Sequence, residues 1–116
     1  MPQSRRNLLP AQLSTAAPLF AALGDATRLR IVMRLCDGGP QSIAHLTAGA
    51  YVSRQAVTKH LRALEQVRLV CSERSGRERI WQLRQKKLQE VRAFVDQISG
   101  AWDQALERLR AMVEST

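Results

Sequence analysis

Residues 53–68, SRQAVTKHLRALEQVR, predict one helix with an apolar side for the protein core and a polar side for solvent or a ligand. Ser53 can accept a hydrogen bond from a free amide of the first turn, and Val57, Leu61 and Leu64 follow at helical spacing on a stripe that belongs in a core. The opposite face offers amides, a hydroxyl and cations without a carboxylate: Gln55, Thr58, Lys59, Arg62 and Gln66. Such a face suits the base edges and phosphates of a DNA major groove. The stretch therefore predicts a DNA recognition helix.

The positive charge of the chain is concentrated around this helix. The formal net charge is +8, and residues 53–87 hold ten Lys and Arg against three Glu, which is +7 of that total. An ordinary solvated helix face does not require its neighbours to be basic as well. Charge gathered in one segment is the electrostatic footprint of a polyanion site.

The segments on either side of this helix complete a known DNA-binding arrangement. Ser42 can cap a short helix that ends at Gly49, and three residues separate Gly49 from the second cap at Ser53, which predicts a helix-turn-helix. After the helix, residues 69–73 and 79–83 read as two strands around a Ser75–Gly76 turn, with Trp81 and Leu83 toward the domain. The hairpin is interpreted as a wing, with three guanidinium groups near its tip: Arg74, Arg77 and Arg79.

Two further helices precede the helix-turn-helix. Because Pro18 fits the first turn of a helix but not its interior, we expect a helix that begins near Thr15 and buries Phe20 and Leu23. Asp25 should cap the next helix. Its apolar positions at helical spacing are Ala26, Leu29, Val32, Met33 and Cys36.

The last third of the chain carries a heptad pattern from about Lys86 to Val113. Its apolar seam comprises Leu88, Val91, Val95, Ile98, Trp102, Ala105, Leu109 and Met112. A helix of this length runs about 40 Å, farther than the core of so small a domain, so part of the seam lacks a partner within the chain. A twofold dimer would cover it, whereas a monomer would have to fold the helix over its own domain.

Length and composition set the outer limits of the fold. The 116 residues suffice for one domain, which we place at residues 13–116 after a flexible tail at 1–12. No apolar run approaches the roughly 20 residues of a membrane span, and the start carries no export signal, so a cytoplasmic protein without membrane contact is expected. The predicted class is mainly α with a small β-hairpin: a winged helix-turn-helix of five or so helices with a long C-terminal dimerisation helix.

The assembled pattern resembles the ArsR family of bacterial winged helix-turn-helix repressors. The resemblance covers about Leu13 to Val113 and is carried by LFAALGDATRLRIVMRL at 19–35, VSRQAVTKHLRALEQVRLV at 52–70 and SGRERIWQL at 75–83. It implies a homodimer that binds an imperfect inverted repeat in double-stranded DNA, through recognition helix 53–67 and wing 70–83, and blocks transcription. Helices 13–23 and 86–113 would form the dimer interface, with Leu13 and Phe20 joining the heptad seam.

The resemblance also assigns contact positions. The DNA-reading positions fall on Ser53, Arg54, Gln55, Thr58, Lys59 and His60, and the wing contacts on Arg74 and Arg77; the residue pattern adds Arg62. One position departs from the family, because Arg68 stands where a Gly usually ends the recognition helix. The left-handed conformation that ends such a helix is energetically less favourable for Arg than for Gly.

Several other functions compete with DNA-binding repression. The family's clustered thiolate ligands and its Asp and His pairs are absent, since the last helix has Asp96 and Asp103 without a His, and no metal or other cofactor is expected. Cys36 and Cys71 leave a redox-responsive repressor as an alternative, with two inert cysteines as the default. A winged-helix protein-interaction module is a second alternative. No motif indicates an enzyme, and the nature of any effector stays open.

Overall fold

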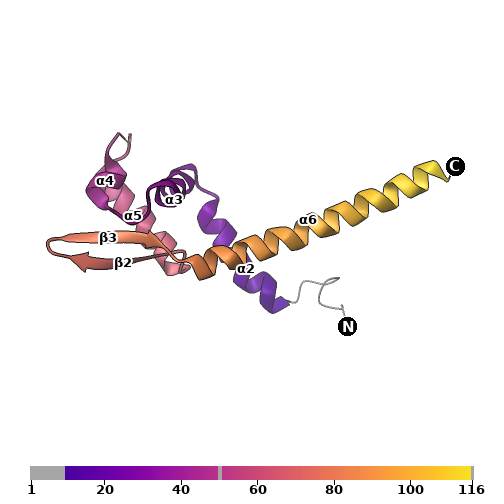
Figure 1. Ribbon diagram of the computed structural model, residues 1–116, viewed down its shortest axis with the longest axis horizontal. Coiled ribbons are helices and arrows are strands. Elements are labelled where there is room, and N and C mark those ends of the chain that lie inside the picture. The colour runs from indigo at the N-terminus through magenta and orange to yellow at the C-terminus, as the bar shows by residue number, and fades with distance from the viewer. Residues whose placement is uncertain (1–9, 50, 116) are drawn as a thin grey trace.

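The computed structural model describes residues 10–49 and 51–115. In chain order these form α2 (Pro10–Leu23), α3 (Ala26–Gly38), β1 (Gln41–Ser42), α4 (Ile43–Thr47), α5 (Arg54–Gln66), β2 (Val70–Ser75), β3 (Glu78–Leu83) and α6 (Gln85–Glu114). The short elements gather at one end, and α6 runs away from them to the C-terminus (Figure 1). The molecule therefore measures 67 × 30 × 20 Å. The predicted class, mainly α with a hairpin and a long last helix, is confirmed.

The core lies where α3, α4 and α5 meet the sheet. Its most completely buried side chains are Trp81, Leu46, Leu61, Leu64, Leu69, Val57 and Val70. The predicted buried stripe of α5, formed by Val57, Leu61 and Leu64, is confirmed. Burying one such aliphatic side chain contributes about 1.5–3 kcal/mol, so this stripe fixes how α5 is turned and which of its faces remains in solvent.

Three side chains cap helices as the sequence predicts. Asp25 Oδ2 accepts from the Arg28 amide at 3.0 Å, Ser42 Oγ from the His45 amide at 3.2 Å, and Ser53 Oγ from the Ala56 amide at 3.1 Å. Each cap satisfies an amide that has no partner within its helix. The boundaries of α3, α4 and α5 follow from these local bonds.

The first helix is longer than expected. It begins at Pro10 instead of near Thr15, and so includes Pro18 in its interior and the last three residues of the predicted tail; the rest of that tail lies outside the described residues. Pro18 removes one bond of the helix ladder, but its side chain is exposed, where water can hydrate a freed carbonyl. The helix is held instead by burial of Ala16, Leu19 and Ala22.

The buried face of α3 also differs from the prediction. Val32 enters the core as predicted, together with Ile31 and Leu35, whereas the predicted Leu29 and Met33 are 46% and 56% exposed. Cys36 is exposed as well. The helix carries apolar residues on more than one side, so its periodicity alone identifies only part of the buried stripe.

The sheet has three antiparallel strands in the order β1-β3-β2. No sequence pattern predicted β1, whose Gln41 and Ser42 pair with Trp81 and Ile80 of β3. The hairpin strands are longer than predicted and the turn shifts by one residue, to Gly76 and Arg77 between the paired Ser75 and Glu78. Gly76 has a φ of 64°, and a positive φ at the first of two loop positions is the pattern of a type II′ turn.

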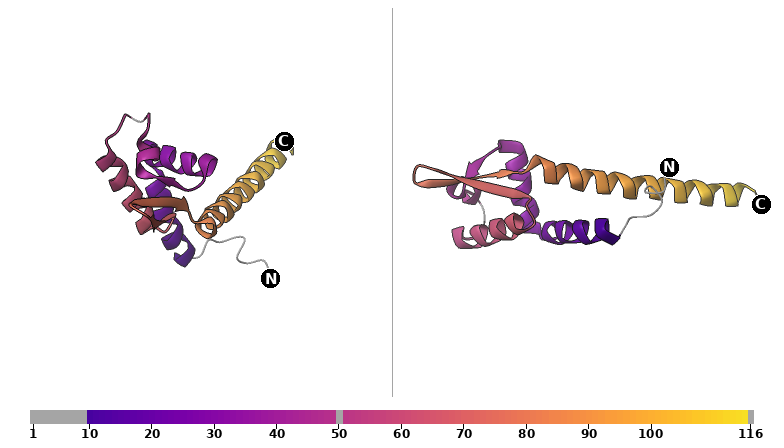
Figure 2. Two further views of the ribbon diagram at one scale, coloured as in Figure 1. Left: turned by 60° about the vertical axis from the view of Figure 1, so that its left-hand side comes forward. Right: turned by 90° about the horizontal axis from the view of Figure 1, so that it is seen from below.

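Helix α6 has two halves with different surroundings. Leu88 and Val91 in its first half pack against the core, and the ring of Phe94 lies 5.4 Å from that of Phe20 on α2. Farther along, Ile98 and Trp102 are exposed, and the outer part of α6 extends beyond the other described elements (Figure 2). The described helices include none that is long and apolar enough to cross a membrane.

Candidate nucleic-acid interface

The exposed face of α5 carries the side chains that the sequence assigns to DNA. Arg54, Gln55 and Lys59 are exposed, and Thr58 is partly exposed, with its hydroxyl donating to the Arg54 carbonyl at 2.9 Å. Ser53 caps the helix and marks its first turn. Ser53 satisfies the Ala56 amide, whereas other amides of the first turn have no partner within the helix. Together with the positive end of the helix dipole, they favour an anion such as a phosphate.

Arg62 lies on the same helix but makes contacts within the chain. Its Nη1 donates to Glu65 Oε1 at 3.2 Å, and its guanidinium carbon is 5.6 Å from the centre of the Trp81 ring. The side chain is still 56% exposed. Arg62 therefore covers the buried Trp81 of the wing strand while one side of its guanidinium faces solvent.

His60 faces α3 and is only 23% exposed. Its Nδ1 accepts a hydrogen bond from Arg28 Nε at 3.2 Å and lies 3.8 Å from Asp25 Oδ2. Because Nδ1 accepts, the neutral ring carries its proton on Nε2. The hydrogen bond from the Arg28 backbone amide is the main cause that lowers the pKa of Asp25. The three side chains join the start of α3 to the recognition helix.

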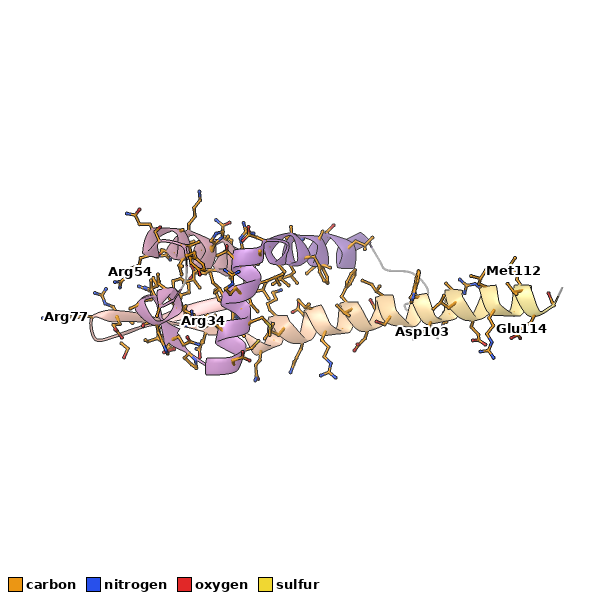
Figure 3. The ribbon with its side chains drawn as sticks, turned by 90° about the horizontal axis from the view of Figure 1, so that it is seen from above. Arg34, Arg54, Arg77, Asp103, Met112 and Glu114 are labelled. Carbon is orange, nitrogen blue, oxygen red and sulfur yellow. The ribbon has the colours of Figure 1, made fainter. Side chains whose placement is uncertain are left out.

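The three arginines of the wing differ in their positions and contacts. Arg74 and Arg79 are cross-strand partners, and Arg79 Nη1 donates to Ser72 Oγ at 2.9 Å. Arg77 occupies the second loop position and is exposed. Figure 3 shows Arg77 and Arg54 at the same end of the molecule, opposite Met112 and Glu114. The fold thus brings the wing tip and the start of α5 to one end.

Arg68 takes the left-handed backbone conformation, which is unfavourable for residues other than Gly. Its φ is 64°, and it is the one described non-Gly residue with a positive φ. The Leu69 amide donates to the Leu64 carbonyl at 3.0 Å and the Arg68 amide to the Glu65 carbonyl at 2.9 Å. This pair of bonds is a Schellman motif, so α5 ends as it would with Gly, at an energetic cost.

Sequence reasoning missed Arg34 as a support of the interface. Its guanidinium donates to the carbonyls of His45, Leu46 and Ala48 at 3.1, 3.2 and 2.9 Å. These carbonyls belong to the end of α4, where the helix leaves acceptors without partners. Arg34 thereby fixes the first helix of the helix-turn-helix to α3, and its place on a polar helix side gave no sign of this role.

The cysteines and acidic residues show no arrangement of metal ligands. Within residues 10–49 and 51–115, no three His, Cys, Asp or Glu side chains are grouped so that they could hold a metal ion. Cys36 is free and exposed. Cys71 is free and partly buried on β2, where Gln82 Nε2 lies 3.8 Å from its sulfur.

A short helix, a turn, a capped basic helix and an arginine-tipped hairpin define a winged helix-turn-helix protein. The family described as bacterial regulatory protein, arsR family, matches residues 25–72. The HTH-type transcriptional regulator Rv2034 of Mycobacterium tuberculosis is 37% identical over 96 residues, which cover 83% of this chain and 86% of that protein. The chain belongs to the ArsR family of bacterial transcriptional regulators, and the predicted resemblance is confirmed.

Solved structures agree with this assignment. An ArsR-like transcriptional regulator from Rhodococcus sp. RHA1 superposes with a TM-score of 0.77 and 33% identity, covering 94% of this chain and 99% of that chain. A homodimeric winged helix-turn-helix DNA-binding domain from Mycobacterium bovis shares the fold, with a TM-score of 0.63 and 21% identity over 78% of this chain and 82% of that chain.

Proposed function

We propose that this regulator is a homodimeric repressor that binds an inverted repeat in double-stranded DNA through recognition helix 53–67 and wing 70–83. The observation that carries the proposal is the exposed, acid-free face formed by Arg54, Gln55 and Lys59, at the same end of the molecule as Arg77. A surface of this chemistry is matched to phosphates and base acceptors.

The contact residues divide into two roles. Gln55 projects from the first turn of α5 and has the paired donor and acceptor that read an adenine edge in the major groove. The other proposed contacts are suited to phosphates: Ser53, Arg54, Thr58, Lys59, His60, Arg62, Arg74 and Arg77. Among them, His60 and Arg62 are held by partners within the chain, so they would contact DNA while fixing α5 to its neighbours.

Dimerisation is proposed through α2 and the outer half of α6. Ile98, Trp102, Leu109 and Met112 are 49%, 63%, 55% and 67% exposed, and this much apolar side chain on one helix is costly in water. Leu13 and Val95, 46% and 42% exposed, and the partly buried Ala105 extend this surface. Leu88, Val91 and Phe20 lie closer to the chain's own core and would only border the interface.

The proposed assembly sets the spacing of the DNA site. In a twofold dimer, two copies of α5 would enter successive major grooves about 34–36 Å apart. The relative from Mycobacterium bovis is described as homodimeric, which supports a closed pair. Bound at a promoter, such a dimer would block transcription.

The proposal is tested by combining sedimentation with selection of bound genomic DNA fragments. We expect a dimer at micromolar concentration, enrichment of an inverted repeat, and a log affinity that falls steeply with log salt while the sequence preference survives. Fusing the selected fragment to a reporter gene then tests repression. A lone subunit, or binding that is equally strong on unrelated DNA, would contradict the proposal and favour a protein-interaction module.

A further inference from the structure

His60 lies at the edge of the exposed face of α5, where the recognition helix meets α3. At about 100° per residue, it falls between the exposed Lys59 and the buried stripe of the helix. Its side chain is 23% exposed. The ring nitrogen Nε2 makes no hydrogen bond with a described residue and is not among the buried atoms that lack a partner. This nitrogen is therefore available to a group outside the chain, while the other nitrogen contacts α3.

The other ring nitrogen, Nδ1, lies near two side chains of opposite charge. Arg28 Nε donates a hydrogen bond to it at 3.2 Å, which requires Nδ1 to carry no proton. Asp25 Oδ2 lies 3.8 Å from the same atom, too far for a hydrogen bond but close enough to attract a charged ring. The neutral ring thus bonds to Arg28, whereas a ring with a proton on Nδ1 would bond to Asp25.

The other elements that pack on α5 do not provide a further charged partner for this ring. Helix α2 contains no ionisable side chain. On α5 itself, the residues three and four positions from His60 are apolar: Ala56, Val57, Ala63 and Leu64. The remaining ionisable side chains of α3, α4 and β2 form no hydrogen bond or ion pair with the ring: Arg30, Arg34, Cys36 and Asp37, then His45, then Cys71, Glu73 and Arg74. Asp25 and Arg28 therefore decide between the two states of His60.

The exchange of partners leaves none of the three side chains without a bond. Arg28 Nη1 keeps its hydrogen bond to the Ala22 carbonyl at 3.1 Å when Nδ1 gains a proton. Asp25 already accepts the Arg28 amide, and a carboxylate has room for a second donor. The buried core packs α3 against α5 in both states. Protonation of His60 thus changes the charge at the edge of the recognition helix and leaves the fold unchanged.

We propose that His60 is a proton-linked phosphate contact, so that the regulator binds DNA more tightly as the pH falls from about 7 to about 5.5. Histidine is the side chain whose charge ordinarily changes in this range. The protonated ring would hold Asp25 through Nδ1 and donate from Nε2 to a DNA phosphate. Because the polyanion favours the charged ring, DNA binding takes up protons, and acid by the same linkage strengthens binding. The phosphate contact rests on the proposed function, whereas the exchange at Nδ1 does not.

Proton uptake is tested by NMR of the imidazole rings in the full chain. The chain has two histidines, so His45→Gln leaves the ring signals of His60 alone. At about pH 6.5, adding the selected DNA fragment should raise the ratio of protonated to neutral His60 by about threefold. In the free protein, Asp25→Asn should lower this ratio, because the protonated ring loses the charge of its acceptor. A ratio that DNA leaves unchanged would overturn the phosphate contact, and a ratio that Asp25→Asn leaves unchanged would overturn the exchange.

The consequence for affinity is measured on the same DNA fragment between about pH 7 and about pH 5.5, where carboxylates and thiols keep their ordinary charge states. The parent dimer should gain about fivefold to tenfold in affinity, since each half-site contributes one ring. Its slope of log affinity against log salt should steepen by one to about two units. His45→Gln, a change on the exposed histidine of α4, should behave like the parent, whereas His60→Gln should lose the dependence on pH. A thermal melt at each pH checks that all three proteins are folded.

The outcomes separate this inference from the proposed function. If the parent binds its DNA site with the same affinity at every pH, or if His60→Gln gains affinity as the parent does, the proton-linked contact is wrong and DNA binding stands. If His45→Gln alone abolishes the pH dependence, the inference is wrong as well, because the proton then binds at α4. If the parent prefers no DNA sequence at any pH, the proposed function itself fails, and the Asp25→Asn comparison still tests the exchange at Nδ1.

Discussion

Arg28 donates a hydrogen bond from Nε to Nδ1 of His60 at 3.2 Å, across 32 residues of sequence. The same guanidinium donates from Nη1 to the Ala22 carbonyl at 3.1 Å, so one side chain joins α2, α3 and α5. These bonds add to the buried core, which also packs the three helices together.

We expect His60→Ala to lower the free energy of unfolding by about 1 kcal/mol, because Arg28 loses a part-buried acceptor. Urea unfolding of His60→Ala, Arg28→Ala and the double variant forms a cycle, and the two changes should be less than additive by about 0.5–1 kcal/mol. Lys59→Ala, an exposed neighbour, is the control and should stay within about 0.5 kcal/mol of the parent. Additive losses would mean that the Arg28–His60 bond does not contribute.

The depressed pKa of Asp25 predicts a dependence of stability on pH. Its carboxylate accepts the Arg28 amide, which lowers its pKa below the ordinary value. A carboxyl with a lowered folded-state pKa stabilises the fold above its unfolded-state pKa, near pH 4, and loses that contribution as pH falls through the folded value. Asp25→Asn keeps a capping acceptor but removes the charge. Its melting temperature should lie below that of the parent at about pH 6 and converge with it near about pH 3; a constant gap would contradict the assignment.

The left-handed Arg68 predicts a stabilising substitution. A non-Gly residue in this region costs about 1 kcal/mol or more, and Gly fits it freely. We expect Arg68→Gly to raise the free energy of unfolding by roughly 0.5–1 kcal/mol, measured by urea denaturation. Arg68→Ala removes the charge but keeps Cβ, so it should not stabilise. Equal gains from both variants would point to charge repulsion instead of backbone strain.

Local signals in the sequence predicted the caps and the buried stripe of α5. A cap depends on residues within one turn of each other, as with Ser53 and Ala56, and a single dominant stripe leaves little choice of face. The exposed face of α5 follows from that stripe. The part of the candidate site that lies on one helix could therefore be predicted from the sequence.

Contacts between segments that are distant in the sequence could not be predicted from such local signals. Strand β1 has only two residues, too few for an alternating pattern, and it exists because Gln41 pairs with Trp81 and bonds through its side chain to the Arg34 carbonyl at 2.7 Å. The bond from Arg28 to His60 likewise depends on how two helices cross. Helix α3 has apolar residues on several sides, and only its packing against the rest of the domain determines that Ile31 is buried and Leu29 is exposed.

The outer half of α6 predicts a variant that dissociates the proposed dimer without unfolding the domain. Trp102 and Leu109 are 63% and 55% exposed in one chain, so replacing both by Gln costs the monomer little, whereas each lost interface anchor costs about 2 kcal/mol. We expect a monomer at micromolar concentration by sedimentation. The chain has two tryptophans, so the emission of the remaining, buried Trp81 reports whether the core is intact.

A polar change on the same helix provides the control. Arg108 is exposed, and Arg108→Gln should leave both the dimer and the Trp81 emission unchanged. A Trp102→Gln/Leu109→Gln protein that still sediments as a dimer would place the interface elsewhere on the molecule. Loss of the buried Trp81 signal would instead show that the outer helix is needed for folding.

The two proposed kinds of DNA contact predict two different responses to substitution. Gln55→Ala removes a base-reading side chain, so it should cost about 1–3 kcal/mol on the preferred site and relax the preference at one position of each half-site. Arg77→Ala removes a phosphate contact from the wing tip, so it should weaken binding to all sequences alike. It should also flatten the slope of log affinity against log salt by about one unit per wing, or about two per dimer.

Binding measured over a salt series, on the selected site and on versions with single base changes, distinguishes the two responses. Arg92→Gln removes an exposed positive charge from α6, outside the proposed interface, and so controls for net charge. If Gln55→Ala left the base preference untouched, the reading face would lie elsewhere on α5. If Arg92→Gln flattened the salt slope as much as Arg77→Ala, the wing would act only through the overall charge, because a specific phosphate contact requires the arginine to lie at the duplex.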